Sequence, residues 1–179
     1  MAWFEKMFAT ALVAVLSAAA AAQTPPDFSG RWTAAPPATA SGVRGVSIAT
    51  GTMGSGWGDE ITIARDGSRL TVERAQFSQY DMQPPMRLTY ALDGSESRNT
   101  INMGRGPQEI LSKAVRQDGT LVITSRYRVD APERARTEAI EVRQVLSLDA
   151  SGSLVVTTTL GGLGGGPPST STTTYKKNP

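Results

Sequence analysis

The chain of 179 residues contains no cysteine and no histidine. Without cysteine there is no disulfide, no thiolate nucleophile and no attachment point for the lipid of a bacterial lipoprotein, so the hydrophobic core has to hold the fold by itself. Without histidine there is no Ser–His triad, no histidine proton shuttle and no zinc or copper site of the usual kind. The chemistry still open to the chain uses paired carboxylates, a lysine, a tyrosine or a hard cation bound by carboxylates.

Clustered charge is also scarce. The 18 Lys and Arg residues almost balance the 16 Asp and Glu residues, for a net charge of +2, and no run of Lys or Arg is longer than two residues. Nucleic-acid binding needs positive charge gathered on one surface. We therefore expect no nucleic-acid partner.

Acidic residues that could work as a catalytic pair are few. Most of them lie at expected turns or on expected outward faces, and the pairs to consider are Glu60 with Glu73 and Asp81 with Glu96. Carboxylate acid–base chemistry needs two such groups close together, one of them with a raised pKa. With histidine and cysteine also missing, this pattern predicts that the protein is not an enzyme and uses no metal and no cofactor.

Residues 1–22 have the pattern of an export signal. A short segment with one lysine, MAWFEK, precedes the apolar stretch MFATALVAVL and the small residues SAAAAA. This order is typical of a signal peptide cleaved between Ala22 and Gln23, and the alternative is an uncleaved N-terminal anchor. The pattern predicts a periplasmic or secreted bacterial protein whose single domain, residues 23–179, does not span a membrane once the signal is removed.

From residue 59 onward the hydrophobic pattern repeats every second residue, as in β-strands. A two-residue Asp-Gly loop in DEITIARDGSRLTVER predicts that Ile63 lies opposite Leu70 and that Glu60 lies opposite Glu73. The side chains that this alternation places on one apolar face are Ile61, Ile63, Leu70 and Val72.

Further segments alternate in the same way. A first strand is expected at Phe28–Ala34, another at Met86–Leu92, a hairpin with a bulged turn ending in Gly119 over residues 109–128, and a closing strand in STSTTTYKK. The residues predicted to face inward from these segments and from residues 138–160 are Trp32, Met86, Leu88, Tyr90, Leu92, Leu111, Val115, Leu121, Ile123, Tyr127, Ile140, Val142, Leu146, Leu148, Leu154, Val156 and Leu160.

Together these segments predict an all-β domain. Closure into an antiparallel up-and-down (lipocalin-like) barrel of about 8–10 strands would remove exposed strand edges, and a two-sheet β-sandwich is the alternative. The Gly-rich stretches 41–58 and 161–168 are expected to be long, mobile loops. The strands are expected to be too short and too polar outside for an outer-membrane barrel, which needs strands of about 9–11 residues.

The polar stretch LDGSESRN follows the strand expected at Met86–Leu92. Asp93 and Gly94 are turn formers, the serines can make local hydrogen bonds, and Glu96 could pair with Arg98. These properties predict the corner of a hairpin, and a contact with a polar ligand is the alternative.

The motif Gly30-Arg31-Trp32 in FSGRW resembles the opening of lipocalin-like (calycin) barrels. The resemblance implies that the Trp packs across one end of the barrel and that a basic residue near the last strand, here Lys176 or Lys177, lies over it. A broader resemblance covers nearly the whole domain, from DFSGRW through GWGDEITIARDGSRLTVER to the final TYKK. On it the chain is similar to small secreted bacterial proteins of uncharacterised function, which implies secretion and an all-β lipocalin-like fold but no particular activity.

Several large or polar residues share the inward phase. A buried amide such as that of Gln144 needs hydrogen-bond partners, which inside a barrel are water, another side chain or a ligand. One hypothesis is a binding protein for a small apolar or amphipathic ligand. The alternative is a filled barrel, a non-catalytic structural or interaction protein whose Gly-rich loops contact a cell-envelope partner. The residues predicted to line a ligand site are Trp32, Met86, Tyr90, Tyr127 and Gln144.

Overall fold

The computed structural model describes residues 26–36, 57–77, 82–102, 107–131, 136–161 and 166–179, and the predicted export signal lies outside them. Every regular element in these ranges is a strand. The strands are β1 (Gly30–Ala34), β2 (Glu60–Asp66), β3 (Arg69–Phe77), β4 (Met82–Ala91), β5 (Glu96–Asn102), β6 (Pro107–Gln117), β7 (Thr120–Ala131), β8 (Arg136–Leu148), β9 (Leu154–Leu160) and β10 (Ser169–Lys177).

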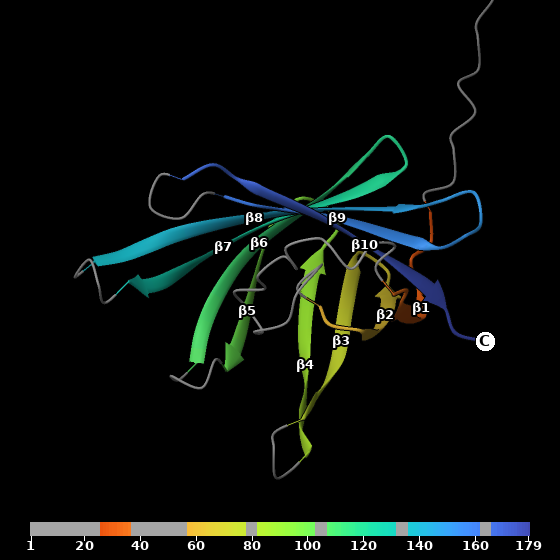
Figure 1. Ribbon diagram of the computed structural model, residues 1–179, viewed down its shortest axis with the longest axis horizontal. Coiled ribbons are helices and arrows are strands. Elements are labelled where there is room, and N and C mark those ends of the chain that lie inside the picture. Colours follow the sequence, from red (N-terminus) through yellow and green to blue (C-terminus); the bar gives the residue numbers. More distant parts are fainter. Residues whose placement is uncertain (1–25, 37–56, 78–81, 103–106, 132–135, 162–165) are drawn as a thin grey trace, which may run out of the picture.

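The ten strands form one antiparallel, up-and-down sheet that curls into a nearly closed barrel (Figure 1). Strands that follow each other in the chain are hydrogen-bonded, except β4 and β5, and β10 returns to pair with β1. The backbone ladder is interrupted at one place, between β4 and β5. This arrangement confirms the predicted all-β barrel and rules out the two-sheet sandwich.

The β2–β3 hairpin has the predicted faces but a different register. Ile63 lies opposite Val72 rather than Leu70, because the loop consists of Gly67 and Ser68. The shift is two residues long, so each side chain keeps its face. Glu73 consequently lies opposite Thr62, and the expected pairing of Glu60 with Glu73 is wrong.

The β6–β7 hairpin corrects a second prediction. Its loop is the two-residue Asp118-Gly119, with φ angles of 47° and 75°, as a type I′ turn requires, and it contains no bulge. An even loop reverses which residues of β6 share a face with Leu121 and Ile123. Leu111 and Val115 were predicted to face inward and instead point outward, while the buried side chains of β6 are Ile110, Ser112 and Ala114.

Strand length also differs from expectation. β4, β6, β7 and β8 contain 10, 11, 12 and 13 residues. Pro84 and Pro85 lie within β4 rather than before it, opposite a register shift between Arg74 and Gln76 of β3. A proline cannot donate to a ladder, so an irregular position beside the open edge of β4 is where it is tolerated. The length argument against an outer-membrane barrel is therefore wrong. In the described part of the chain, no helix is long and apolar enough to cross a membrane.

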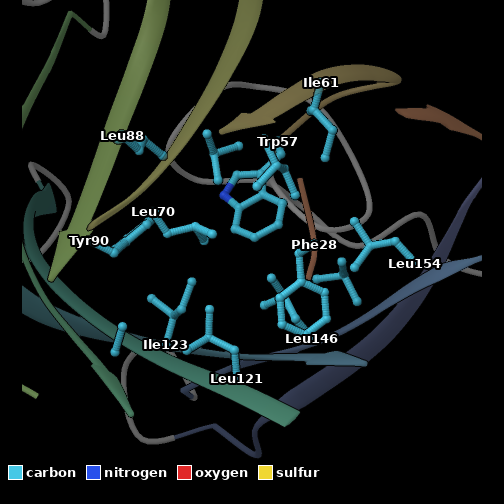
Figure 2. Packing of buried hydrophobic residues seen from close by; sticks show 14 of the residues in the cluster. Phe28, Trp57, Ile61, Leu70, Leu88, Tyr90, Leu121, Ile123, Leu146 and Leu154 are labelled. Carbon is cyan, nitrogen blue, oxygen red and sulfur yellow. The ribbon is translucent and has the colours of Figure 1, made fainter. Parts of the chain in front are cut away.

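Side chains from every strand point into the barrel and form one core. Figure 2 shows the rings of Trp57 and Phe28 in the middle of a circle of aliphatic side chains. Trp57 belongs to the stretch 41–58, which was expected to be a loop, and yet its side chain is part of the core. The buried apolar residues are Phe28, Trp32, Trp57, Ile61, Ile63, Leu70, Val72, Met86, Leu88, Tyr90, Ile101, Ile110, Ala114, Leu121, Ile123, Ile140, Leu146, Leu154, Val156 and Tyr175.

The two ends of the barrel are built differently. Because the strands alternate in direction, the β2–β3, β4–β5, β6–β7 and β8–β9 turns lie at one end, which we call the turn end. The five other connections, β1–β2, β3–β4, β5–β6, β7–β8 and β9–β10, lie at the opposite end, which we call the loop end. The C-terminus follows β10 and lies beside β1 (Figure 1).

Candidate functional site

The residues predicted to line a ligand site come from four strands of the barrel. Trp32, Met86, Tyr90 and Gln144 are all buried, on β1, β4 and β8. Tyr127 lies on β7, where its backbone is opposite Ile140, and its side chain is outside the described set. The inward phase assigned to the first four is correct, whereas their role in binding stays a prediction.

Trp32 packs across the turn end of the barrel. Its indole Nε1 donates to the backbone oxygen of Phe28 at 3.0 Å, and the Nζ of Lys177 lies 5.5 Å from the centre of the ring. The lysine reaches this position across Gly30, where a Cβ would lie 2.6 Å from the Lys177 Cε. Of the two lysines that the lipocalin resemblance offered, Lys177 therefore occupies the place over the Trp.

Tyr90 and Trp57 are joined inside the barrel by a side-chain hydrogen bond. Burial raises the pKa of the Tyr90 phenol far above its usual value, and the bond to Trp57 offsets only part of that rise. Tyr90 is therefore a neutral phenol at any physiological pH. Its ring packs in the core near Leu70 and Leu88 (Figure 2), so much of the space it faces is already occupied.

A second group of inward side chains is polar, and we call it the polar stripe: Ser112, Ser125, Gln144, Thr158 and Ser171. Strand register brings them together, because Ser112 lies opposite Ser125 and Thr158 lies opposite both Gln144 and Ser171. The Oγ atoms of Ser112 and Ser125 are 2.8 Å apart, a buried hydrogen bond. The first four residues are buried and Ser171 is half-buried.

Thr158 stands out within the stripe. Its residue is only 8% exposed, and its Oγ1 has no hydrogen-bond partner among the residues that the structure describes. A buried hydroxyl without a partner costs about 1–3 kcal/mol. An inward hydroxyl without a partner in the protein is suited to form a hydrogen bond with the polar group of a bound molecule.

The stripe crosses the inner wall near the middle of the strands. β8 runs from the loop end to the turn end, so Gln144 comes before Leu146, and β9 runs the other way, so Thr158 comes after Leu154 and Val156. Apolar inward residues lie on both sides of the stripe: Leu146, Leu154 and Val156 toward the turn end, and Ile140, Val142 and Leu160 toward the loop end.

Arg74 brings a cation to the inner face of β3, in phase with Leu70 and Val72. Burial lowers the pKa of its guanidinium, and the nearby Tyr175 acts in the opposite direction. Its Nη1 lies so close to Gly58 that a Cβ there would be 3.2 Å away, and the Tyr175 hydroxyl donates to the Gly58 carbonyl at 2.8 Å. This half-buried arginine was not recognised in the sequence pattern.

Of the two acidic pairs considered above, Glu60 and Glu73 are not opposite each other. Glu73 makes an ion pair with Arg87 at 2.6 Å on the outside of the barrel, and Asp81 lies outside the described residues. Glu109 likewise pairs with Arg98, so the predicted contact between Glu96 and Arg98 is not the one formed. Among the residues described, no three acidic side chains come together as a group that could hold a metal ion.

The β4–β5 corner carries more than turn chemistry. The Ser95 backbone N–H donates to the Asp93 carboxylate at 2.9 Å, as predicted for a hairpin corner. The side chains of Ser97 and Asn99 then bridge the gap in the ladder: Ser97 Oγ accepts from the Ala91 N–H at 2.7 Å, and Asn99 bonds both backbone groups of Thr89. These side-chain hydrogen bonds connect β5 to β4 where the backbone ladder is interrupted, and so they close the barrel.

The hydroxyl residues of the stripe were missed at the level of sequence. Thr158 shares its phase with Leu154 and Val156, so the alternation of β9 was a usable signal. Ser112 was hidden because β6 had been assigned the opposite phase. Neither a protein-family model nor a curated protein sequence matches this chain.

Proposed function

We propose that the protein binds a small amphipathic molecule inside its barrel, in an exported setting given by the signal-like residues 1–22. The observation that carries the proposal is the polar stripe on an inner wall that is otherwise apolar. A ligand with an apolar body and one polar group would match both parts, since pockets of this kind combine apolar walls with a few placed polar groups. Thr158 and Gln144 provide such groups.

Energetics support the same reading. A barrel that only needed a core would be more stable with apolar residues at these positions, because burying a hydroxyl without a partner is unfavourable. Trp32 and Lys177, which lies over its ring, are near the turn end, so we propose that the ligand enters from the loop end, with its apolar body toward Leu146 and Leu154 and its polar group at the stripe.

A second candidate function is a filled barrel that contacts a cell-envelope partner. It is favoured by Trp57 and Phe28, each 2% exposed, which occupy the middle of the barrel in Figure 2. Under this proposal the interior is a core only, and interaction belongs to the connections at the loop end.

Titration with N-phenyl-1-naphthylamine, an uncharged apolar dye that fluoresces in apolar surroundings, separates the two proposals. A binding barrel takes up the dye saturably, at one molecule per chain, and releases it when 1-tetradecanol is added. The matched control is Gln144→Leu against Thr159→Val: the first changes the inner wall and should alter displacement, the second changes the outer wall and should not. Absence of saturable uptake, together with no molecule retained from lipid extracts in native mass spectrometry, contradicts binding and leaves the filled barrel.

A further inference from the structure

Thr158 and Gln144 form one recognition point within the polar stripe. They are directly opposed across β8 and β9, a position that puts cross-strand Cβ atoms about 4.5–5.5 Å apart. Both residues are buried, at 8% and 5% exposure. A hydroxyl and an amide each donate and accept hydrogen bonds, so together they suit a group that does the same.

The described inward neighbours of this pair on β7, β8, β9 and β10 carry no charge. Across the strands its inward neighbours are Ile123 and Ser171, and along the strands they are Val142, Leu146, Val156 and Leu160. Moving an ionised group from water to such a place is far more costly than moving a neutral polar group. Arg74, the cation described above, lies on β3, which is hydrogen-bonded to neither β8 nor β9.

We propose that the polar group of the ligand is uncharged, an alcohol, ester or amide, and that it is bound by the Thr158 hydroxyl beside Gln144. This inference rests on the proposed function and makes it more specific, because it selects among amphipathic molecules by their head group. Thr158 then acts as a specificity-determining residue. Its buried hydroxyl, which is unfavourable in the free protein, gains a hydrogen-bond partner when the ligand binds.

The test compares three probes that share a chain length and differ in head group: 1-tetradecanol, tetradecanoate and tetradecylammonium. Each displaces N-phenyl-1-naphthylamine from the purified protein at neutral pH, where the second and third are ionised. The alcohol is expected to bind at least about tenfold more tightly than either ion. The inference would be overturned if tetradecanoate bound as tightly as the alcohol or more tightly, and if the Arg74→Met variant lost this binding. Arg74 would then be the residue that binds the polar group.

Thr158→Val is the informative variant because it removes the hydroxyl while keeping the shape of the side chain. It is expected to weaken binding of the alcohol by about threefold to tenfold and to raise Tm of the free protein by about 2–4 °C, since a buried group without a partner is removed. The higher Tm shows that the variant is folded. Thr158→Ser keeps the hydroxyl and should retain the affinity.

Thr159→Val is the matched control on the outer face, where Thr159 Oγ1 lies 3.1 Å from Thr170 Oγ1. It should leave the affinity for the alcohol unchanged. Unchanged alcohol binding by Thr158→Val contradicts the inference while saturable dye binding still supports the proposed function. Failure of the wild-type protein to bind the dye or any of the three probes contradicts both.

Discussion

Lys177 holds its ammonium group 5.5 Å from the centre of the Trp32 ring, across the β1–β10 pair that joins the first and last strands of the chain. The contact depends on Gly30, because the lysine side chain passes where any larger residue would place its Cβ. A cation at this distance is attracted to the face of an indole ring. The Gly-x-Trp motif therefore has a physical reason in this barrel: the glycine makes room for the cation that covers the tryptophan.

Gly30→Ala is expected to lower the free energy of unfolding by about 1–3 kcal/mol, because Gly30 has a φ of 147° that a residue with a Cβ adopts only under strain. The same change pushes Lys177 off the indole. In the Gly30→Ala background, Lys177→Ala should therefore cost little more. Urea unfolding of the two single variants and the double variant measures this coupling.

The control for Gly30 is Gly67→Ala. Gly67 also has a positive φ, 54°, but a Cβ there would meet nothing within 4 Å. It should cost about 1–2 kcal/mol and leave the effect of Lys177→Ala unchanged. Losses that simply add in the Gly30→Ala, Lys177→Ala double variant would show that the glycine does not serve the lysine.

Lys177→Ala by itself is expected to lower the free energy of unfolding by about 0.5–1 kcal/mol, the usual size of a cation–π contact near the surface. Lys176→Ala, one residue earlier and exposed, should have no measurable effect. Equal losses for both lysines would mean that general charge, rather than the contact with Trp32, is responsible. Chemical denaturation at low and high salt distinguishes the two.

Asn99→Ala should weaken the closure of the barrel between β4 and β5. The side chain of Asn99 accepts from the Thr89 N–H at 2.8 Å and donates to the Thr89 carbonyl at 3.0 Å, so its removal leaves two backbone groups to find other partners. We expect a loss of about 2–4 kcal/mol and faster hydrogen exchange of the Thr89 amide.

Thr100→Ala serves as the control for Asn99, since Thr100 is the next residue of β5 and is exposed. It should leave exchange at Thr89 unchanged. If Asn99→Ala leaves the exchange rate of Thr89 at its wild-type value, other contacts hold the closure between β4 and β5.

The stability of the protein is expected to fall in acid through Asp149. Hydrogen bonds from the Ser151 side chain and from the backbone N–H groups of Ser153 and Ser151 hold the pKa of its carboxyl below the usual 3.8. A lowered pKa in the folded state stabilises the fold above the unfolded pKa, and this stabilisation is lost as the pH falls through the folded pKa. Asp93 and Asp27 have lowered pKa values for the same reason, with Ser95 and Ser29 as donors.

The measurement is Tm between pH 6 and pH 2 for the wild type, Asp149→Asn and Asp149→Ala. Asn keeps an acceptor oxygen but cannot titrate, so Asp149→Asn should show a smaller fall in Tm with acid than the wild type. Asp149→Ala should be less stable than Asp149→Asn at neutral pH. A wild-type Tm that falls no more than that of Asp149→Asn would contradict the assignment.

Most of the barrel was predictable because alternation is a local signal. In β2 and β8 most of the large apolar residues share one phase, and Ile61, Ile63, Ile140 and Leu146 are buried as predicted. β6 has apolar residues in both phases, Ile110 and Ala114 in one and Leu111 and Val115 in the other. Its own sequence could not decide, and the length of the turn to β7 decided for it.

The candidate site was predictable only in part. Trp32, Met86, Tyr90 and Gln144 are large or polar residues in an inward phase, and the structure buries all four. Thr158 is one of several consecutive threonines, and what distinguishes it is the register that sets it opposite Gln144. Trp57 lies outside any alternating segment, so nothing nearby in the sequence marked it as a core residue.

The sequence by itself determined the all-β class, the approximate number of strands, the approximate positions of the turns and the inward phase of most strands, because these depend on residues close together in the chain. Tertiary structure decided the register of the hairpins, the closure through Ser97 and Asn99, and the place of Lys177 over Trp32. These features join residues that are far apart in the chain or balance nearly equal alternatives. The interactions that stabilise these features form only when the strands are paired in the folded protein.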